Sequence, residues 1–285
     1  MRLVKKWKKR WRRFLFEQLA SAVRRGELRP FRVDLDGVWF ETAHGFAVLC
    51  NFEDRILELD VHPVWEEMET TFVSSNIRPG DVFVDVGANI GYFSMLAAQN
   101  QPARVLAFEP VPGTFDLLTR NIRHNNLGEI IEPVNMALGS RDRTAKSVCA
   151  LGPKNHIEYT LDDDDAGLAT VEVRIGPLDG WLKEHASIER VDFIKVDIEG
   201  YEYEFLRGAR ETIRSFRPMV LMEVEEYRLA KFGVTAEEVF GFMKEAGYEY
   251  LRVGPEEIVP GTCPEKDLSM TRNFVFYTPQ RPPEY

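Results

Sequence analysis

The sequence predicts an α/β fold built on one mostly parallel sheet, and three stretches carry that prediction. Residues 82–86 form an apolar, β-branched and aromatic run that leads through a glycine loop into a helical pattern. Residues 104–110 and 191–196 are two further buried runs. Apolar strands that alternate with helical segments are typical of parallel sheets covered by helices on both faces. We count seven core strands and find no internal repeat.

The size and composition of the chain suit one large domain with additions. It has 285 residues, of which 44% are hydrophobic and 12% aromatic, which is enough for a substantial core. The three cysteines, Cys50, Cys149 and Cys263, lack C-x-x-C spacing, so neither a disulfide framework nor a zinc site is indicated. No stretch of about 18 apolar residues occurs, so no membrane-spanning helix is expected. These features favour a reducing, cytoplasmic location.

Charge is unevenly distributed along the chain. The net charge is −10, but residues 1–13 carry eight Lys or Arg and no acidic residue. The remaining residues therefore hold 28 basic against 46 acidic side chains. An acidic body disfavours extensive contact with nucleic-acid phosphates, so no nucleic-acid partner is expected.

Residues 1–20 form a predicted basic amphipathic helix. Apolar residues from Leu3 to Leu19, including Trp7 and Trp11, recur at three- and four-residue steps between Lys and Arg. Such a helix suits the surface of an anionic membrane, which would place the protein peripherally on the inner face of that membrane. The alternatives are packing of the tryptophan stripe on the domain or on a partner chain, and disorder.

Three parts of the chain are expected: a basic helix, a small β-rich extension and the main domain, at residues 1–25, 26–61 and 62–285. Within the extension, turn signals at residues 36–37 and 44–45 separate short strand-like pieces. A helix over residues 62–76 follows. The Pro-Gly pair at residues 79–80 then breaks the chain before the central strand.

The central strand, residues 82–86, carries a carboxylate into a loop bracketed by two glycines. Asp85 lies near the end of the strand, where α/β sheets bind ligands. Gly87 and Gly91 allow close approach of the backbone to a ligand, and Asn89 adds a polar contact. Strand, loop and helix together predict free backbone N–H groups aimed at whatever lies above the strand.

Three interpretations of this loop are open. An ordinary strand-to-helix turn needs no ligand. A nicotinamide or flavin dinucleotide prefers G-x-G-x-x-G, which the G-A-N-I-G spacing does not match. S-adenosylmethionine (SAM) fits best, because an acidic residue suits its ammonium group and loop N–H groups suit its carboxylate.

The next βα unit supports the SAM interpretation. Residues 104–110 form a second buried strand that ends in Glu109, 24 residues beyond Asp85. An acidic residue in this place can accept both ribose hydroxyls of an adenosyl group. This residue by itself leaves an NAD-type ribose contact open.

A helix at 112–125 and a third strand near 130–135 complete this part of the predicted sheet. Asn135, Met136 and Ala137 end that strand and would lie near an adenine. A strand-like pair follows, at residues 144–150 and 169–175. The acidic loop between them, residues 162–165, is expected to be solvated, because it lacks the regular ligand spacing of a calcium loop.

Residues 191–200 place charges in a buried strand. Lys195 interrupts the apolar run 191–196, and Asp197 and Glu199 follow it before Gly200. Residues at alternating positions point to the same side of an extended strand. Two interpretations are open: an internal ion network, or a group over the carboxyl edge of the sheet beside the reactive end of the cofactor.

The last third of the chain continues the α/β pattern. Residues 218–224 form a fifth buried strand that includes Glu223. A helix over 235–246 starts with a capping box, in which Thr235 is followed three residues later by Glu238. The last expected elements are two strands and a loose tail, at residues 248–253, 273–278 and 280–285.

The chain resembles the FkbM family of SAM-dependent methyltransferases. The resemblance is carried by the stretches FVDVGANIGYFS, AFEP, IKVDIEGYEYEFLRGA and PMVLMEVE, and it covers about residues 66–278. The glycine loop alone indicates only the wider class I methyltransferase fold, whereas the K-V-D-I-E-G block is more specific. Residues 1–60 and the acidic loop lie outside the resemblance.

The resemblance implies a Rossmann-like fold with a seven-stranded sheet, parallel except for its last strand. It also implies methyl transfer from SAM to an oxygen, commonly a hydroxyl of a sugar, glycan or secondary metabolite, so the expected partner is a small-molecule or glycan acceptor. The candidate cofactor-binding residues are Asp85, Gly87, Ala88, Asn89, Gly91, Glu109, Pro110, Asn135, Ala137 and Asp197. The candidate catalytic residues are Asp197, Lys195, Glu199 and Glu223.

Methyl transfer to an alcohol needs a group that takes the hydroxyl proton as the new bond forms. Asp197 is the first choice for this base, and Glu199 and Glu223 are the alternatives. Lys195 would fix the geometry and charge state of the carboxylates, since a nearby opposite charge lowers a carboxyl pKa. The clustered carboxylates could instead bind Mg²⁺, which would acidify a diol. This is the weaker alternative, because Lys195 already balances the charge, and no metal ligand is assigned.

Two other functions are compatible with the same residues: a non-catalytic SAM-binding module and an NAD(P)-dependent oxidoreductase. Specificity for the acceptor is expected to come from residues 1–60, 144–175 and 225–234, none of which carries a recognisable motif. The sequence indicates neither the acceptor nor the oligomeric state.

Overall fold

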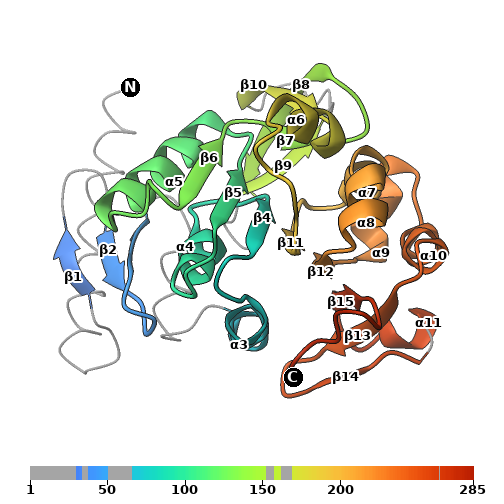
Figure 1. Ribbon diagram of the computed structural model, residues 1–285. Helices are drawn as coiled ribbons and strands as arrows, with labels where there is room; N and C mark the ends of the chain where they lie inside the picture. The colour runs from blue at the N-terminus through green and yellow to red at the C-terminus, as the bar shows by residue number, and fades with distance from the viewer. Residues whose placement is uncertain (1–29, 34–37, 51–65, 152–156, 162–168, 263) are drawn as a thin grey trace.

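The computed structural model describes residues 30–33, 38–50, 66–151, 157–161, 169–262 and 264–285. The fold is built around a central sheet of eight strands, whose arrangement is drawn in Figure 1. The strand order is β14-β13-β15-β12-β11-β4-β5-β6. These strands span Val82–Val86 (β4), Arg104–Phe108 (β5), Ile131–Val134 (β6), Phe193–Val196 (β11), Met219–Glu223 (β12), Glu249–Val253 (β13), Ile258–Pro260 (β14) and Asn273–Tyr277 (β15).

The pairing pattern confirms the predicted mostly parallel sheet. Strands β6, β5, β4, β11 and β12 pair in parallel, and β15 runs antiparallel to both β12 and β13. All seven predicted core strands are present, and the short β14 adds an eighth at the edge. Strands β4 and β11 are neighbours in the middle of the sheet, although a long stretch of chain separates them (Figure 1). The order of strands reverses at this point, which is where open α/β sheets bind ligands.

Helices cover both faces of the sheet because its strands are apolar on both sides; all five residues of β4 are buried. Helices α3 (Glu67–Asn76), α4 (Tyr92–Ala98) and α5 (Pro112–His124) pack on the face that includes Phe83. Helices α6 (Leu178–Glu184), α7 (Glu202–Gly208), α8 (Arg210–Phe216) and α10 (Ala236–Glu245) pack on the face that includes Val84. The short elements α9 (Glu226–Leu229), η1 (Ala230–Phe232) and α11 (Pro264–Asp267) complete the helices.

A second sheet of four strands, in the order β7-β10-β8-β9, is inserted between β6 and α6. Its strands span Ala137–Leu138 (β7), Arg143–Leu151 (β8), Ile157–Leu161 (β9) and Ala169–Gly176 (β10). The antiparallel pairing of β8 with β10 confirms the predicted strand pair. Strand β9 was not predicted, and the acidic loop at 162–165 lies outside the described residues.

A third sheet precedes the main domain. It consists of β1 (Pro30–Val33), β2 (Val38–Glu41) and β3 (Ala47–Cys50), paired antiparallel in that order. These strands lie within the β-rich extension expected at residues 26–61. The helix predicted over 62–76 is present as α3, and the basic helix predicted over 1–20 falls outside the described residues.

The C-terminal tail was predicted to be loose, and this prediction was wrong. Arg281 forms ion pairs with the buried carboxylates of Asp81 and Asp192, at 2.6 and 2.9 Å. The backbone N–H of Glu284 donates to the side-chain oxygen of Asn76. The tail is therefore fixed against the amino edge of the sheet through residues that lie 89 to 208 positions earlier, which no local pattern reveals.

Candidate active site

The loop between β4 and α4 has the left-handed backbone that its glycines predict. Gly87 and Gly91 have φ values of 80° and 92°, and Asn89 has a φ of 51°. A Cβ atom on Gly87 would lie 2.1 Å from the carbonyl oxygen of Asp197. The glycine loop therefore abuts the segment that follows β11, and a larger residue would displace that segment.

The N–H groups of this loop were predicted to be free, and for four of them this was wrong. The N–H of Gly91 donates to the carbonyl oxygen of Ala88 at 2.8 Å. The N–H groups of Gly87 and Ala88 both donate to the carbonyl oxygen of Phe108. The N–H of Asn89 donates to a carboxylate oxygen of Glu109 at 3.0 Å. The loop curls over the end of β5, so these donors meet acceptors of the protein itself.

Asp85 is a buried carboxylate in which one of the two oxygens is unpaired. Its side chain accepts a hydrogen bond from the Ser94 hydroxyl at 2.6 Å, and the residue is 1% exposed. The second oxygen, Oδ1, has no hydrogen-bond partner within the described part of the chain. Burial raises the pKa of Asp85, against the opposing effects of Lys195 and Ser94. An unpaired buried oxygen of this kind is costly, and a donor from a ligand would relieve the cost.

Lys195 sits beside Asp85 in the sheet register and carries a positive charge into the core. Its Nζ atom lies 3.1 Å from Oδ2 of Asp197 and 4.5 Å from the centre of the Phe93 ring. Burial by itself would lower the pKa of Lys195, but the negative charges of Asp197 and Glu66 outweigh it and raise the pKa above its usual value. The ammonium therefore stays protonated and neutralises the carboxylates around it.

Glu109 follows β5 and accepts hydrogen bonds on both oxygens. The donors are the N–H groups of Asn89, at 3.0 Å, and of Val111, at 2.9 Å. Burial raises the pKa of Glu109 to about 7, although these two donors oppose it. The side-chain amide of Asn135 donates to the carbonyl oxygens of Glu109 and Pro110, which fixes the end of β5 against the end of β6.

Glu223 ends β12 on the other side of Lys195 from the glycine loop. Burial raises the pKa of Glu223 to about 8, and the charges of Asp197 and Glu225 add to the effect. Arg272 approaches Glu223 at 3.9 Å and is itself largely exposed. Glu223 is thus a second carboxyl at the same edge as Asp197, and its side chain is more buried.

Glu199 does not share the orientation that its spacing predicted. Strand β11 ends at Val196, and Glu199 has a left-handed φ of 61°, so the alternation of an extended strand stops before it. Its carboxylate forms an ion pair with Arg228 of α9, which also pairs with Glu225. Of the three charged residues at positions 195, 197 and 199, the first two are brought together, and the third is directed to α9.

Two further carboxylates at this edge were missed by the sequence analysis. Glu66 and Glu69 lie at the start of α3, and their pKa values are raised by burial, that of Glu66 to about 7. The charges of Lys195 and Asp197 act on both, and Asn273 donates to Glu69. A usable signal existed, because a helix that precedes a parallel strand runs against it and starts at the carboxyl edge.

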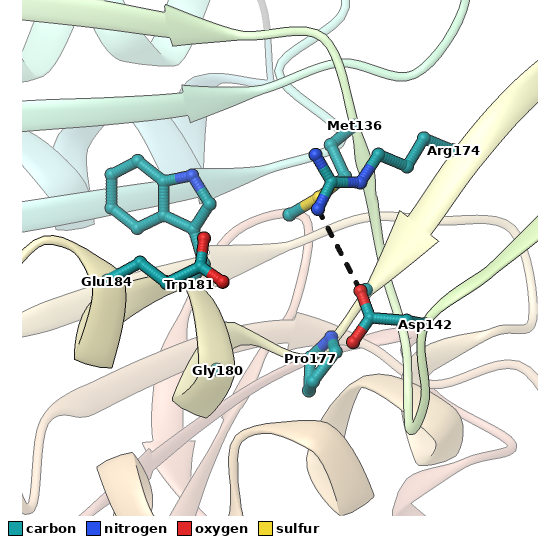
Figure 2. Close-up of a pocket in the computed structure, with 8 residues that line it drawn as sticks. Met136, Asp142, Arg174, Pro177, Gly180, Trp181 and Glu184 are labelled. Carbon is teal, nitrogen blue, oxygen red and sulfur yellow. Dashed lines mark ion pairs between the residues drawn. The ribbon is translucent and has the colours of Figure 1, made fainter.

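A small pocket lies beyond the end of β6, next to the segment predicted to contact adenine. Figure 2 shows Met136 and Trp181 on two of its sides, with Arg174 and Asp142 forming an ion pair of 3.9 Å across a third. Ala137 follows Met136 in the chain and is the first residue of β7. Among the residues that the structure describes, no group of three or more His, Cys, Asp or Glu side chains is placed to hold a metal ion.

No helix in the described ranges is both long enough and apolar enough to cross a membrane.

Relatives of known sequence include several methyltransferases. Methyltransferase sdnD of Sordaria araneosa is 29% identical over 55% of this chain and 71% of its own length. The hexuronic acid methyltransferase AglP of Haloferax volcanii is 28% identical over 70% of this chain and 80% of its own length. Among solved structures, the methyltransferase FkbM from Methylobacillus flagellatus KT aligns with a TM-score of 0.44 and 18% identity. That alignment covers 70% of this chain and 44% of the other.

The family comparison covers the candidate site itself. The sequence profile of the methyltransferase FkbM domain matches residues 85–250, which is more than half of the chain. The matched region begins at Asp85 and includes Glu109, Lys195, Asp197 and Glu223. With its parallel sheet and the glycine loop at the reversal point, the chain is a methyltransferase and belongs to the FkbM methyltransferase family.

Proposed function

We propose that this methyltransferase moves a methyl group from SAM to a hydroxyl oxygen of a sugar or of another small hydroxylated metabolite. The observation that carries the proposal is the Lys195–Asp197 pair at the carboxyl edge of the sheet. The Asp197 backbone lies directly against Gly87, so the pair and the cofactor loop form one site. The Asp197 side chain is 35% exposed, whereas the Lys195 side chain is 7% exposed, so the carboxylate is the accessible member of the pair.

The residues around β4 and β5 fit SAM. The unpaired Oδ1 of Asp85 offers an acceptor for an ammonium group, and Gly87 permits close contact with the backbone. A carboxylate has about four acceptor positions, so Glu109 keeps capacity for ribose hydroxyls after its two backbone contacts. Bound SAM would supply a methyl group on a positively charged sulfur. Its remaining proposed contacts are Ala88, Asn89, Gly91, Pro110, Asn135 and Ala137.

Asp197 is the proposed base for the acceptor hydroxyl. Lys195 stays protonated and holds one carboxylate oxygen, which leaves the other to accept a proton from a hydroxyl within hydrogen-bond reach. Glu223 is the alternative base, since its pKa of about 8 suits proton acceptance near neutral pH. Glu199 is bound to Arg228, so we assign it the part of fixing the loop that carries Asp197.

The charges around Asp197 favour a neutral hydroxyl over an anionic acceptor group. An anionic acceptor group would meet the Asp197 carboxylate and, as pH rises through about 7 to 8, also the ionised carboxylates of Glu66 and Glu223 beside it. A hydroxyl also needs a base, whereas a carboxylate acceptor does not. Similarity to a relative named as a hexuronic acid methyltransferase supports a sugar as the acceptor class.

The test is the Asp197→Asn variant in an assay with labelled SAM and a panel of hydroxylated sugars and metabolites. Loss of the base should lower kcat by about 10²–10⁴-fold, while the Kd for SAM stays within a fewfold of the wild-type value. The exposed Asp116→Asn is the control and should leave both quantities unchanged. Unchanged turnover in Asp197→Asn would reject the assignment of the base.

Mg²⁺ is not required by this proposal, because Lys195 supplies the positive charge beside the carboxylates. Turnover should therefore persist when EDTA is added to the assay. A loss of activity that Mg²⁺ restores would replace the base by a metal-assisted mechanism.

Contact with a membrane surface through residues 1–20 is a separate proposal that rests on the sequence alone. The full chain should sediment with anionic liposomes, and a chain that starts at Gly26 should not. Equal sedimentation of the two proteins would reject the proposal of membrane contact.

A further inference from the structure

Two asparagine side chains form hydrogen bonds with the free edge of β3 in the three-stranded sheet β1-β2-β3, here called the N-terminal sheet. Strand β3 is the last strand of its sheet. Asn121 of α5 and Asn125, which caps the C-terminus of that helix, lie one turn apart beside β3. The N–H of Ala47 donates to Asn125 at 2.8 Å, and Asn125 donates back to the Ala47 carbonyl at 2.7 Å. The N–H of Leu49 donates to Asn121 at 2.7 Å. The two amides thus take the place that a further strand would occupy.

Asn121 also reaches the glycine loop, and Asn125 does not. The Nδ2 atom of Asn121 donates to the carbonyl oxygen of Ile90 at 2.8 Å, and the residue is fully buried. The remaining contacts of Asn125 are with Met95 and with the Asn121 carbonyl. One side chain therefore joins the N-terminal sheet to the turn that precedes α4.

Apolar packing around this hydrogen bond also joins the N-terminal sheet to the glycine loop. Ile90 packs against a small apolar cluster that includes Trp39 and Leu49 of the N-terminal sheet. Phe46 meets Tyr92, the first residue of α4, edge to face with 5.4 Å between ring centres. The sheet thus contacts the glycine loop on both sides of Gly91.

We infer that Asn121 is a positioning residue for the cofactor loop, and that residues 38–50 serve the cofactor site rather than acceptor selection. The inference rests on the proposed binding of SAM at this loop. Asn89 and two glycines of the loop have left-handed backbones, a conformation that other residues hold only when their surroundings fix it. The Asn121–Ile90 hydrogen bond provides that restraint from outside the loop. The sequence analysis expected residues 1–60 to select the acceptor. For residues 38–50, we infer instead that they support the binding of SAM.

Two matched variants test the inference by calorimetric titration with S-adenosylhomocysteine. Asn121→Leu and Asn125→Leu each remove one amide that holds β3, so both should lower the melting temperature. Only Asn121→Leu also removes the hydrogen bond to the half-buried Ile90 carbonyl, so it alone should weaken binding, by about tenfold or more, since the loop then loses the contact that restrains its backbone. Asn125→Leu should bind within twofold of the wild type, and KM for the acceptor should be unchanged in both.

Binding within twofold of the wild type in Asn121→Leu, or equal weakening in both variants, would overturn the inference. If Asn121→Leu does not fold, hydrogen exchange on the wild-type protein decides. Coupling is reciprocal, so S-adenosylhomocysteine should slow exchange at residues 46–49 if the inference holds. Unchanged exchange there would refute it. Failure of the wild type to bind at all would instead refute the proposed function.

Discussion

Gly87 is the residue that allows the glycine loop and the segment that carries Asp197 to lie in contact. Its φ of 80° is one that other residues rarely adopt, and an added Cβ would lie 2.1 Å from the Asp197 carbonyl oxygen. The Gly87→Ala variant should therefore lose turnover, because Asp197 must move away from the cofactor loop. It should also lose about 1–3 kcal/mol of stability through backbone strain.

The control for this prediction is Gly113→Ala. Gly113 lies in the first turn of α5 with nothing within 4 Å of an added Cβ, so alanine there should be neutral or stabilising by up to about 1 kcal/mol. Melting temperature and initial rates of methyl transfer are the measurements. A Gly87→Ala enzyme with wild-type kcat would show that Asp197 need not lie where the structure places it.

At the scale of single elements, the sequence predicts what is local and misses what is distant. Helix α10 begins with the predicted capping box, in which Thr235 and Glu238 exchange hydrogen bonds over three residues. Glu66 was missed because its place is set by how α3 meets Lys195, more than 100 residues further on. Glu199 was placed with Lys195 and Asp197 because the end of β11 at Val196 cannot be read from alternating charges.

The C-terminal tail is the element whose role differs most from expectation, and Arg281 tests it. Arg281 pairs with Asp81 and Asp192, whose side chains are 6% and 9% exposed. Arg281→Ala should lower the free energy of unfolding by about 2–3 kcal/mol, because buried carboxylates lose a charged hydrogen-bond partner while Arg190 remains.

Arg78→Ala provides the matched control in urea unfolding. Arg78 pairs with Glu284 of the same tail at 3.6 Å, but both side chains are more than half exposed. Exposed pairs contribute little, so this change should stay within about 0.5 kcal/mol. Equal effects of the two variants would mean that the tail is not fixed by the buried carboxylates.

At the scale of the whole molecule, buried carboxyls make stability fall as pH rises. Burial raises the pKa values of Glu66, Glu109 and Glu202 to about 7 and that of Glu223 to about 8, from an ordinary value of 4.5. Between about pH 4.5 and pH 8 the folded state binds more protons than the unfolded state. The stability that these groups contribute is therefore fully present at and below about pH 4.5 and is lost as pH rises toward 8.

The free energy of unfolding in urea should therefore be larger at pH 5.5 than at pH 8, by up to about 1.4 kcal/mol per pH unit for each group that titrates. Glu202→Gln removes one such group, which accepts hydrogen bonds from Gly200 and Ile198, and should reduce this slope. A free energy of unfolding that rises from pH 5.5 to pH 8 would contradict the charge arrangement described for the site.

Calorimetric titration of the purified chain with SAM and with S-adenosylhomocysteine tests the central claim, a nucleoside cofactor held between Asp85 and Glu109. One molecule of each compound should bind per chain, and Glu109→Ala should weaken binding at least tenfold through loss of the ribose partner. Absence of binding heat at several temperatures with both compounds, or undiminished binding by Glu109→Ala, would contradict the account.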